Sequence, residues 1–286
     1  MINFEEIVKL FGIPSITNST LLTKGKTAST HLLHTSTSRK FILKSLDKKE
    51  QAYFEYKLIR HISERSKDIV SEILTTNFDE PFIEVNKNLY QLQVYVPSIN
   101  EKVPLQKVLN TYQMLEKNLN DFHYEPERSN RFALDMLWTD TKELLKNHYQ
   151  TIYNELSPSI EKLKALDNTQ TNWIHGDLGA WNILHTAGQN VCFIDFSEAR
   201  KGPQYFDLVA IFASYLPQNL EAFPSYNQEF LSACKDSVNL KEFYQTLELW
   251  YVKGILSLLK IDVQSTKEHI LYFSNIIKKI KGLKHQ

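Results

Sequence analysis

Residues 173–182 read WIHGDLGAWN, and this stretch decides the fold and the chemistry that the sequence predicts. It contains His175, Asp177 and Asn182 in the pattern His-x-Asp-Leu-x-x-x-Asn. An aspartate at the centre of such a loop can accept the proton of an attacking hydroxyl, and an asparagine five residues later can return to bind Mg²⁺. We therefore predict that Asp177 is the catalytic base, that Asn182 is a metal ligand and that His175 fixes the loop structurally.

A second aspartate follows at the spacing that this chemistry requires. Asp195 stands thirteen residues after Asn182, where the apolar run 191–196 reaches the end of a predicted strand. A phosphoryl-transfer enzyme places its main magnesium-binding aspartate there, because the hard cation needs oxygen ligands. The alternative is an aspartate that caps a turn after a buried strand. The order and the spacing of the two segments favour Asp195 as a metal ligand.

Residues 202–208 read GPQYFDL and complete a recognisable run. Taken in order, these segments resemble the aminoglycoside phosphotransferase and choline kinase-like superfamily, which consists of small-molecule kinases with a protein-kinase-like fold. The resemblance extends over about residues 20–215 and is sharp over 173–208. Gly176 stands where protein kinases have arginine, which favours the small-molecule branch. The resemblance implies that Asp207 is a structural anchor near the site.

Kinases of this fold also have a lysine that contacts the nucleotide phosphates, on a strand that precedes the catalytic loop in the sequence. Lys44 ends the apolar run FIL and precedes residues 47–50, DKKE, a capping-box pattern that predicts a helix to about residue 64. Its partner is expected on that helix, and Glu50 and Glu55 are the candidates. Glu50 belongs to the capping box. Glu55 falls on the apolar face, where a carboxylate is costly unless it is paired, so we expect Glu55 to pair with Lys44.

The remaining nucleotide contacts are expected in a phosphate loop and at the end of a strand. Residues 22–30 occupy the place of the phosphate loop but contain one glycine where protein kinases have several, and an ordinary polar turn is an equal alternative. Backbone groups after the strand 91–96 are expected to bind adenine. The candidate nucleotide-binding residues in these two segments are Gly25, Thr27, Ser29, Gln93 and Tyr95.

Composition limits the class of protein. The 286 residues contain 33 Lys and Arg and 33 Asp and Glu, so the formal net charge is zero and the basic excess typical of a nucleic-acid binder is missing. Two cysteines are too few for a disulfide framework. No apolar stretch approaches the ~18 residues of a membrane helix, and the first residues do not form a signal peptide. We expect a cytoplasmic protein without nucleic-acid or membrane partners; the sequence predicts no oligomeric state.

The predicted fold is α+β, a two-lobed, protein-kinase-like fold. Residues 1–96 form a nucleotide-binding lobe built on a small antiparallel sheet, with hairpins over 30–45 and 82–96. Residues 97–286 form a mostly helical catalytic and substrate-binding lobe, since apolar residues after Pro97 recur at steps of three and four.

The predicted activity is Mg²⁺-dependent transfer of the γ-phosphoryl group of ATP or GTP to a hydroxyl of an antibiotic or small metabolite. A choline, ethanolamine or sugar kinase is the alternative within this class. The region from residue 200 carries eleven Lys or Arg and eight Asp or Glu, which weakens a polycationic aminoglycoside as the acceptor. Tyr244, Trp250 and Tyr251 could form a cation–π wall for choline, although their spacing favours core packing. A protein kinase, which would carry Ala-Pro-Glu, and a nucleotide-binding pseudokinase are the other readings.

Overall fold

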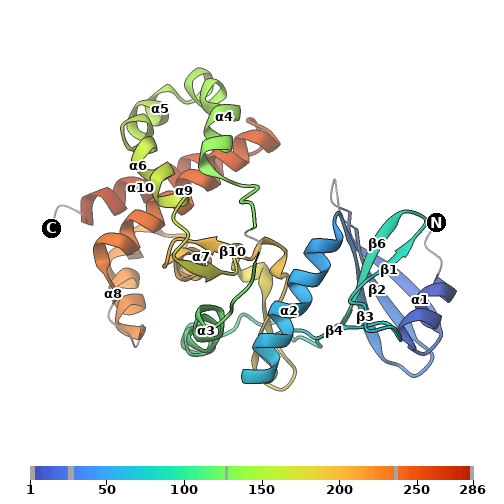
Figure 1. Cartoon of the computed structure of the whole chain (residues 1–286). Coiled ribbons are helices and arrows are strands. Elements are labelled where there is room, and N and C mark those ends of the chain that lie inside the picture. The colour runs from blue at the N-terminus through green and yellow to red at the C-terminus, as the bar shows by residue number, and fades with distance from the viewer. Residues whose placement is uncertain (1–3, 25–28, 126–127, 235–237, 284–286) are drawn as a thin grey trace. The chain divides into compact units, whose positions relative to one another are not determined.

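The computed structural model describes residues 4–24, 29–125, 128–234 and 238–283 (Figure 1). The chain forms two compact units, Met1–Tyr124 with Ile183–Ser197, and Glu125–Asn182 with Glu198–Gln286. The first unit therefore includes residues beyond 96, where the sequence analysis places the boundary. The assignment of nucleotide binding to residues 1–96 and of catalysis to 97–286 stays a prediction.

The first unit is built on an antiparallel sheet with the strand order β1-β2-β3-β6-β4, in which β5 also pairs with β6. Helices α1 and α2 lie on opposite sides of this sheet (Figure 1). The described elements of the unit are α1 (Phe4–Phe11), β1 (Ile16–Lys24), β2 (Ser29–Thr35), β3 (Lys40–Leu46), α2 (Lys49–Arg65), β4 (Ile73–Leu74), β5 (Ile83–Val85), β6 (Asn88–Val94), α3 (Leu105–Asn120), β8 (Ile183–His185) and β9 (Val191–Phe193).

Strand β3 shows how one sheet supports two helices. Phe41 and Leu43 are fully buried and belong to the apolar cluster that includes Ile7 and Phe11 of α1. Because successive side chains of a strand point to opposite faces, Lys44 points toward the face that α2 covers. The pairing of β2 with β3 and of β5 with β6 confirms both predicted hairpins.

Helix α2 ends at Arg65, close to the predicted end, but its predicted capping box is wrong. The N-cap residue is Lys48, and no side chain caps the helix. The helix begins at Lys49, so Glu50 is its second residue, whereas a capping box requires the glutamate at the third. Glu50 is exposed and has no capping role.

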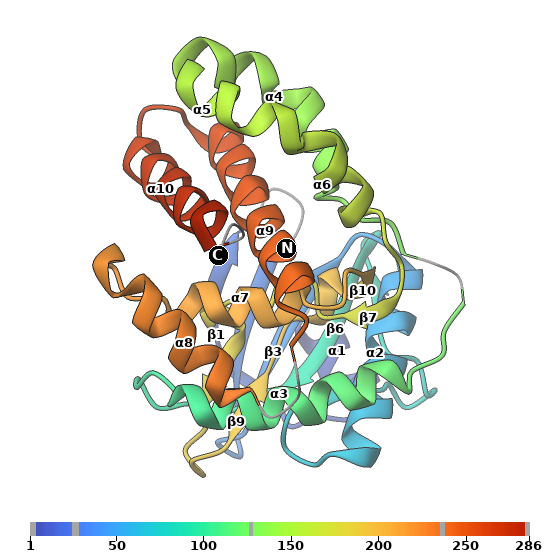
Figure 2. The ribbon, with the colours of Figure 1, turned by 90° about the vertical axis from the view of Figure 1, so that its left-hand side faces the viewer.

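The second unit is helical around α9, with α4, α6, α7 and α10 packed against it (Figure 2). This confirms the predicted helical character of the C-terminal part. The described elements of this unit are α4 (Leu134–His148), α5 (Gln150–Leu156), η1 (Ser157–Ser159), α6 (Ile160–Asp167), β7 (Asn172–Ile174), η2 (Ala180–Asn182), β10 (Arg200–Gly202), α7 (Phe206–Tyr215), η4 (Leu220–Ala222), α8 (Phe223–Ala233), α9 (Leu240–Ile261) and α10 (Lys267–Leu283).

A buried ion pair ties α9 to α6 inside the second unit. Lys253 Nζ lies 2.7 Å from Asp167 Oδ1, and both side chains are buried. Asp167 Oδ2 also accepts hydrogen bonds from the Leu134 amide at 2.7 Å and from Asn130 Nδ2 at 3.3 Å. Burial lowers the pKa of Lys253 to about 8 although Asp167 opposes the shift. This one carboxylate therefore joins α9, the start of α4 and the segment before α4.

Replacing Asp167 by asparagine should destabilise the protein by about 3–5 kcal/mol, because Lys253 would lose its counter-charge and would have to remain an unpaired buried cation or give up its proton. Urea unfolding measures the change. The matched control is Glu64→Gln at the exposed Arg60–Glu64 pair of α2, where we expect a change of at most about 1 kcal/mol. Equal losses in the free energy of unfolding would show that the buried pair contributes no more to stability than the exposed pair.

Within the described ranges, no helix has both the length and the apolar character that crossing a membrane demands.

Candidate functional site

A lysine between two carboxylates forms the first part of the candidate site, inside the first unit. Lys44 Nζ lies 2.6 Å from Asp195 Oδ1 and 3.6 Å from Glu55 Oε2. Glu55 is fully buried, and its Oε1 accepts a hydrogen bond from Gln51 Nε2 at 2.8 Å. The predicted pairing of Lys44 with Glu55 is thus present, and Glu50 takes no part in it.

The charge of Lys44 is maintained by these neighbours. Burial by itself lowers the pKa of the Lys44 ammonium, but the charges of Glu55 and Asp195 outweigh it, and the pKa lies above its ordinary value. Lys44 is therefore a fixed cation at neutral pH. A fixed, positioned ammonium is what a contact to nucleotide phosphates requires.

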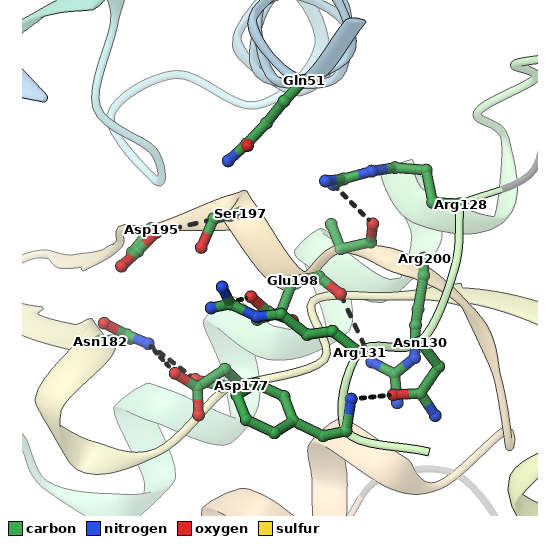
Figure 3. Close-up of polar contacts among 12 residues, drawn as sticks. Gln51, Arg128, Asn130, Arg131, Asp177, Asn182, Asp195, Ser197, Glu198 and Arg200 are labelled. Carbon is green, nitrogen blue, oxygen red and sulfur yellow. Dashed lines mark hydrogen bonds and ion pairs between the residues drawn. The ribbon is translucent and has the colours of Figure 1, made fainter. Parts of the chain in front are cut away.

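Asp195 follows the β8–β9 hairpin and has an unusual backbone conformation. Its φ is +61°, in the left-handed region that aspartate and asparagine tolerate better than most residues. The Ser197 amide lies 3.4 Å from Asp195 Oδ1 and donates to it (Figure 3). The side chain is 44% exposed. The carboxylate is accordingly held in place while part of it remains accessible to a ligand.

Removing either member of the Lys44–Glu55 pair should raise the nucleotide KM or lower kcat, by about tenfold or more, because a charge-assisted contact is lost. The double alanine variant should cost clearly less than the sum of the singles, since one interaction is lost twice. Steady-state kinetics on the four proteins of this cycle provide the measurement. Glu50→Ala is the control on the same helix and should leave the kinetics unchanged and stability within about 0.5 kcal/mol. Additive effects of Lys44→Ala and Glu55→Ala would contradict the coupling.

The structure gives less information on the other five residues that are predicted to contact the nucleotide. Gly25 and Thr27 lie outside the described residues. Ser29 begins β2, and its amide donates to Ser45 Oγ at 2.6 Å. Gln93 is buried on β6, and the Tyr95 amide donates to the Lys40 carbonyl at 3.3 Å, which extends the pairing of β6 with β3. A nucleotide-binding role for these five residues stays a prediction.

The catalytic-loop pattern forms a hydrogen-bonded turn in the second unit. Asn182 Nδ2 donates to the Asp177 backbone carbonyl at 2.7 Å and to Asp177 Oδ2 at 3.1 Å (Figure 3). The indole Nε1 of Trp181 donates to the same Oδ2 atom at 3.2 Å. Two donors therefore orient the carboxylate that the sequence analysis identified as the base. Because the Asn182 nitrogen faces Asp177, its amide oxygen is directed elsewhere and can serve as a ligand.

Asp207 holds the backbone of this loop, in the way that the resemblance implies. Located in the first turn of α7, it is buried and accepts the amides of His175 at 2.6 Å and Gly176 at 2.9 Å, one on each carboxylate oxygen. His175 is fully buried, and its Nδ1 lies 3.4 Å from the Asp177 amide, which donates to it. The structure thus places His175 and Asp207 as supports of Asp177.

Gly176 explains why the loop lacks the arginine of protein kinases. Its φ is +83°, a conformation that side chains rarely adopt. A Cβ atom at this position would overlap the carbonyl oxygen of Glu198 and the guanidinium of Arg200. The loop and the segment Glu198–Arg200 consequently pack in direct contact, which requires glycine.

Two further features of this unit escaped the sequence analysis. The Trp181 ring folds back over Gly179, where any Cβ would overlap it, yet 63% of the residue stays exposed beside Asp177. Arg131 forms an ion pair with Glu198 (Figure 3). The indole–carboxylate contact spans four residues, but the Arg131–Glu198 contact joins distant segments, and no local sequence pattern signals it.

The two predicted metal ligands, Asn182 in the second unit and Asp195 in the first, are chemically suited to magnesium. Asn182 and Asp195 supply an amide and a carboxylate oxygen, which are ligands that Mg²⁺ accepts. Among the described residues, no group of three or more His, Cys, Asp or Glu side chains forms a metal cluster. Magnesium that is held mainly by substrate phosphates and one or two protein ligands does not need such a cluster. Their role as ligands stays a prediction.

The sequence from residue 19 to residue 233 matches the model of the phosphotransferase enzyme family. The chain belongs to this phosphotransferase family. The match includes Lys44, Glu55, Asp177, Asp195 and Asp207, and it confirms the resemblance on which the sequence analysis relied. A comparison with curated proteins gave no match.

Solved structures show the fold of this phosphotransferase-family chain. The amicoumacin kinase hAmiN, in complex with AMP-PNP, Ca²⁺ and Ami, is 13% identical with a TM-score of 0.73, covering 96% of this chain and 92% of that one. Spectinomycin phosphotransferase with ADP and spectinomycin is 14% identical with a TM-score of 0.66, covering 95% and 92%. An aminoglycoside phosphotransferase from Alicyclobacillus acidocaldarius is 13% identical with a TM-score of 0.64, covering 100% and 97%. The predicted kinase-like α+β fold is confirmed.

Proposed function

We propose that this phosphotransferase-family protein is a small-molecule kinase that transfers the γ-phosphoryl group of ATP or GTP to a hydroxyl group of an antibiotic or small metabolite. The observation that carries the proposal is the loop around Asp177. Its carboxylate is oriented by Asn182, and its backbone is anchored on Asp207. A base held in this way is what attack by a hydroxyl on phosphorus requires. A cytoplasmic location, where ATP is available, is part of the same proposal.

The reaction follows from the roles of the chain's own residues. Asp177 accepts the proton of the acceptor hydroxyl as its oxygen forms a bond to the γ-phosphorus. The bond from that phosphorus to the β–γ bridging oxygen breaks, and the nucleoside diphosphate leaves with the electron pair. Lys44, paired with Glu55, neutralises phosphate charge, and Asn182 and Asp195 hold the metal. Mg²⁺ held by these two residues would offset the negative charge of the phosphates.

Related structures support a nucleotide as the phosphoryl donor. The amicoumacin kinase was solved with AMP-PNP, the spectinomycin phosphotransferase with ADP, and an aminoglycoside 2''-phosphotransferase with GDP and kanamycin. These ligands include both adenine and guanine nucleotides. We propose ATP or GTP with Mg²⁺ for this chain, and competition between the two nucleotides decides which one is preferred.

We propose an antibiotic or metabolite as the acceptor, because the three aromatic residues considered for choline do not form an exposed cation–π wall. A cation–π wall requires exposed aromatic faces. Tyr244 and Tyr251 are buried, and Trp250 packs edge-on against Phe206 with ring centroids 5.3 Å apart. Tyr244 and Tyr251 therefore belong to the core of the second unit, and the half-buried Trp250 is occupied by its contact with Phe206.

A screen of hydroxylated small molecules for acceptor-dependent release of ADP or GDP tests the proposal. A kinase releases the diphosphate in proportion to acceptor turnover and transfers ³²P to that acceptor. Binding of Mg²⁺–nucleotide without turnover on any acceptor class would instead identify a nucleotide-binding pseudokinase. Phosphorylation of proteins in preference to small molecules would support the protein-kinase reading, against which Gly176 argues.

A further inference from the structure

Two arginines fasten the segment before α4 to the segment that follows Ser197. Arg128 Nη1 donates to the Ala199 carbonyl at 3.0 Å, and Arg131 forms an ion pair with the Glu198 carboxylate. Figure 3 shows both side chains reaching from one segment to the other. All of these residues belong to the second unit, which also carries Asp177.

This contact lies next to the catalytic loop. The Glu198 carbonyl is so near Gly176 that a Cβ there would overlap it, and Gly176 is bonded directly to Asp177. Burial lowers the pKa of Arg200, and the opposing charges that act on it include both Glu198 and Asp177. The Arg131–Glu198 pair therefore stands within a side chain's length of the loop that holds the base.

The two members of the pair are unequally exposed. The Arg131 side chain is 58% exposed, whereas that of Glu198 is 11% exposed. The Arg131 guanidinium also lies over the ring of Phe132, 5.0 Å from its centroid. A guanidinium has five N–H donors and binds one carboxylate with at most two of them. A molecule that approaches Asp177 past Arg131 therefore meets an exposed cation with N–H donors that the Glu198 carboxylate does not use.

Building on the proposed function, we propose that the acceptor carries an oxyanion, a carboxylate or a phosphate ester, in addition to the hydroxyl that is phosphorylated. Arg131 binds this oxyanion, releasing part of its contact with Glu198, while the hydroxyl is presented to Asp177. Bidentate recognition of planar or tetrahedral oxyanions is the geometry for which arginine is suited. Arg131 is on this view a specificity-determining residue of the acceptor site.

The competing acceptor, a polycation such as an aminoglycoside, requires exposed carboxylates. Apart from the base Asp177, which is partly exposed, the carboxylates next to Arg131 are covered: Glu198 is 11% exposed, and Asp167 and Asp207 are buried. Asp167 is in addition engaged by Lys253. Beside the base, the exposed charge is that of Arg131, which is positive and favours an anionic group on the ligand.

Calorimetric titration of the nucleotide-free protein tests the inference with matched three-carbon probes: glycerate, glycerol 3-phosphate, glycerol and 2-amino-1,3-propanediol, with kanamycin as the polycation. We expect glycerate, glycerol 3-phosphate or both to bind, and Arg131→Ala to weaken that binding about tenfold or more. Arg131→Lys should restore part of it. Glu198→Gln should strengthen it several-fold, because the competing carboxylate is removed. Arg60→Ala, at the exposed pair on α2, is the control and should change nothing.

The outcomes separate this inference from the proposed function. Failure of both anionic probes to bind, unchanged binding in Arg131→Ala, or preferential binding of the amine probes overturns the anionic acceptor, even if kinase activity is found with another molecule. Binding that depends on Arg131, without release of ADP or GDP from any acceptor, supports the oxyanion site and refutes the kinase. Comparison of glycerate with glycerol 3-phosphate shows which oxyanion the site prefers.

Discussion

Asp177→Asn is expected to lower kcat for phosphoryl transfer by about 10²–10⁴-fold, the contribution of a positioned base. The amide keeps the shape of the carboxylate but cannot accept the acceptor's proton. Nucleotide binding should persist, because Lys44 and Asp195 belong to a different part of the chain. Steady-state release of ADP or GDP with the best acceptor measures the loss, and calorimetry with AMP-PNP checks that the nucleotide still binds.

Asp140→Asn is the matched control for that experiment. Asp140 lies on α4 of the same unit and forms an exposed pair with Lys260 at 2.7 Å. We expect its replacement to leave kcat unchanged within about twofold, as for a surface pair. Near-wild-type turnover in Asp177→Asn, or an equal loss in the control, would falsify the assignment of Asp177 as the base.

Asp195→Ala is expected to abolish the part of nucleotide binding that depends on Mg²⁺, because the phosphates lose the ligand that holds their bridging cation. Titration with AMP-PNP, with and without Mg²⁺, measures the difference between the two conditions. Alanine also tolerates the backbone φ of +61° poorly. Asp195→Asn is therefore the companion variant, since asparagine adopts this conformation and removes only the charge.

Asp79 offers a control for backbone effects. Its φ is +59°, and it lies on an exposed turn of the same unit. Asp79→Asn should leave magnesium-dependent binding unchanged. If Asp195→Asn and Asp195→Ala both bind the nucleotide with the wild-type dependence on Mg²⁺, Asp195 is not a metal ligand.

The parts of the site that the sequence predicts are those marked by local motifs, by spacing along the chain and by helical periodicity. The pairing of Lys44 with Glu55 followed from the position of Lys44 after an apolar run and before the helix, and from the cost of a carboxylate on an apolar helix face. The capping box failed because a shift of one residue in the helix start moves Glu50 to the wrong position, and sequence patterns do not define helix ends that finely.

Contacts between segments that are distant along the chain could not be predicted from the sequence. Arg131 and Glu198 are separated by more than sixty residues, and neither has a pattern around it that marks the other as its partner. The same holds for Asp167 and Lys253, which only the packing of α6 against α9 brings together. Both contacts depend on tertiary packing, which overrides local propensity.

The tight approach of Glu198 and Arg200 to Gly176 also limits how this protein can evolve. Any amino-acid substitution at position 176 introduces a side chain into space that Arg200 of β10 and the Glu198 backbone already occupy. An arginine could be accepted only after that neighbouring backbone had moved, and the move alone would loosen the loop around Asp177. An arginine at position 176 therefore requires a second change, in the neighbouring backbone. A single substitution of Gly176 is therefore selected against, and this loop does not acquire the arginine of protein kinases by one mutation.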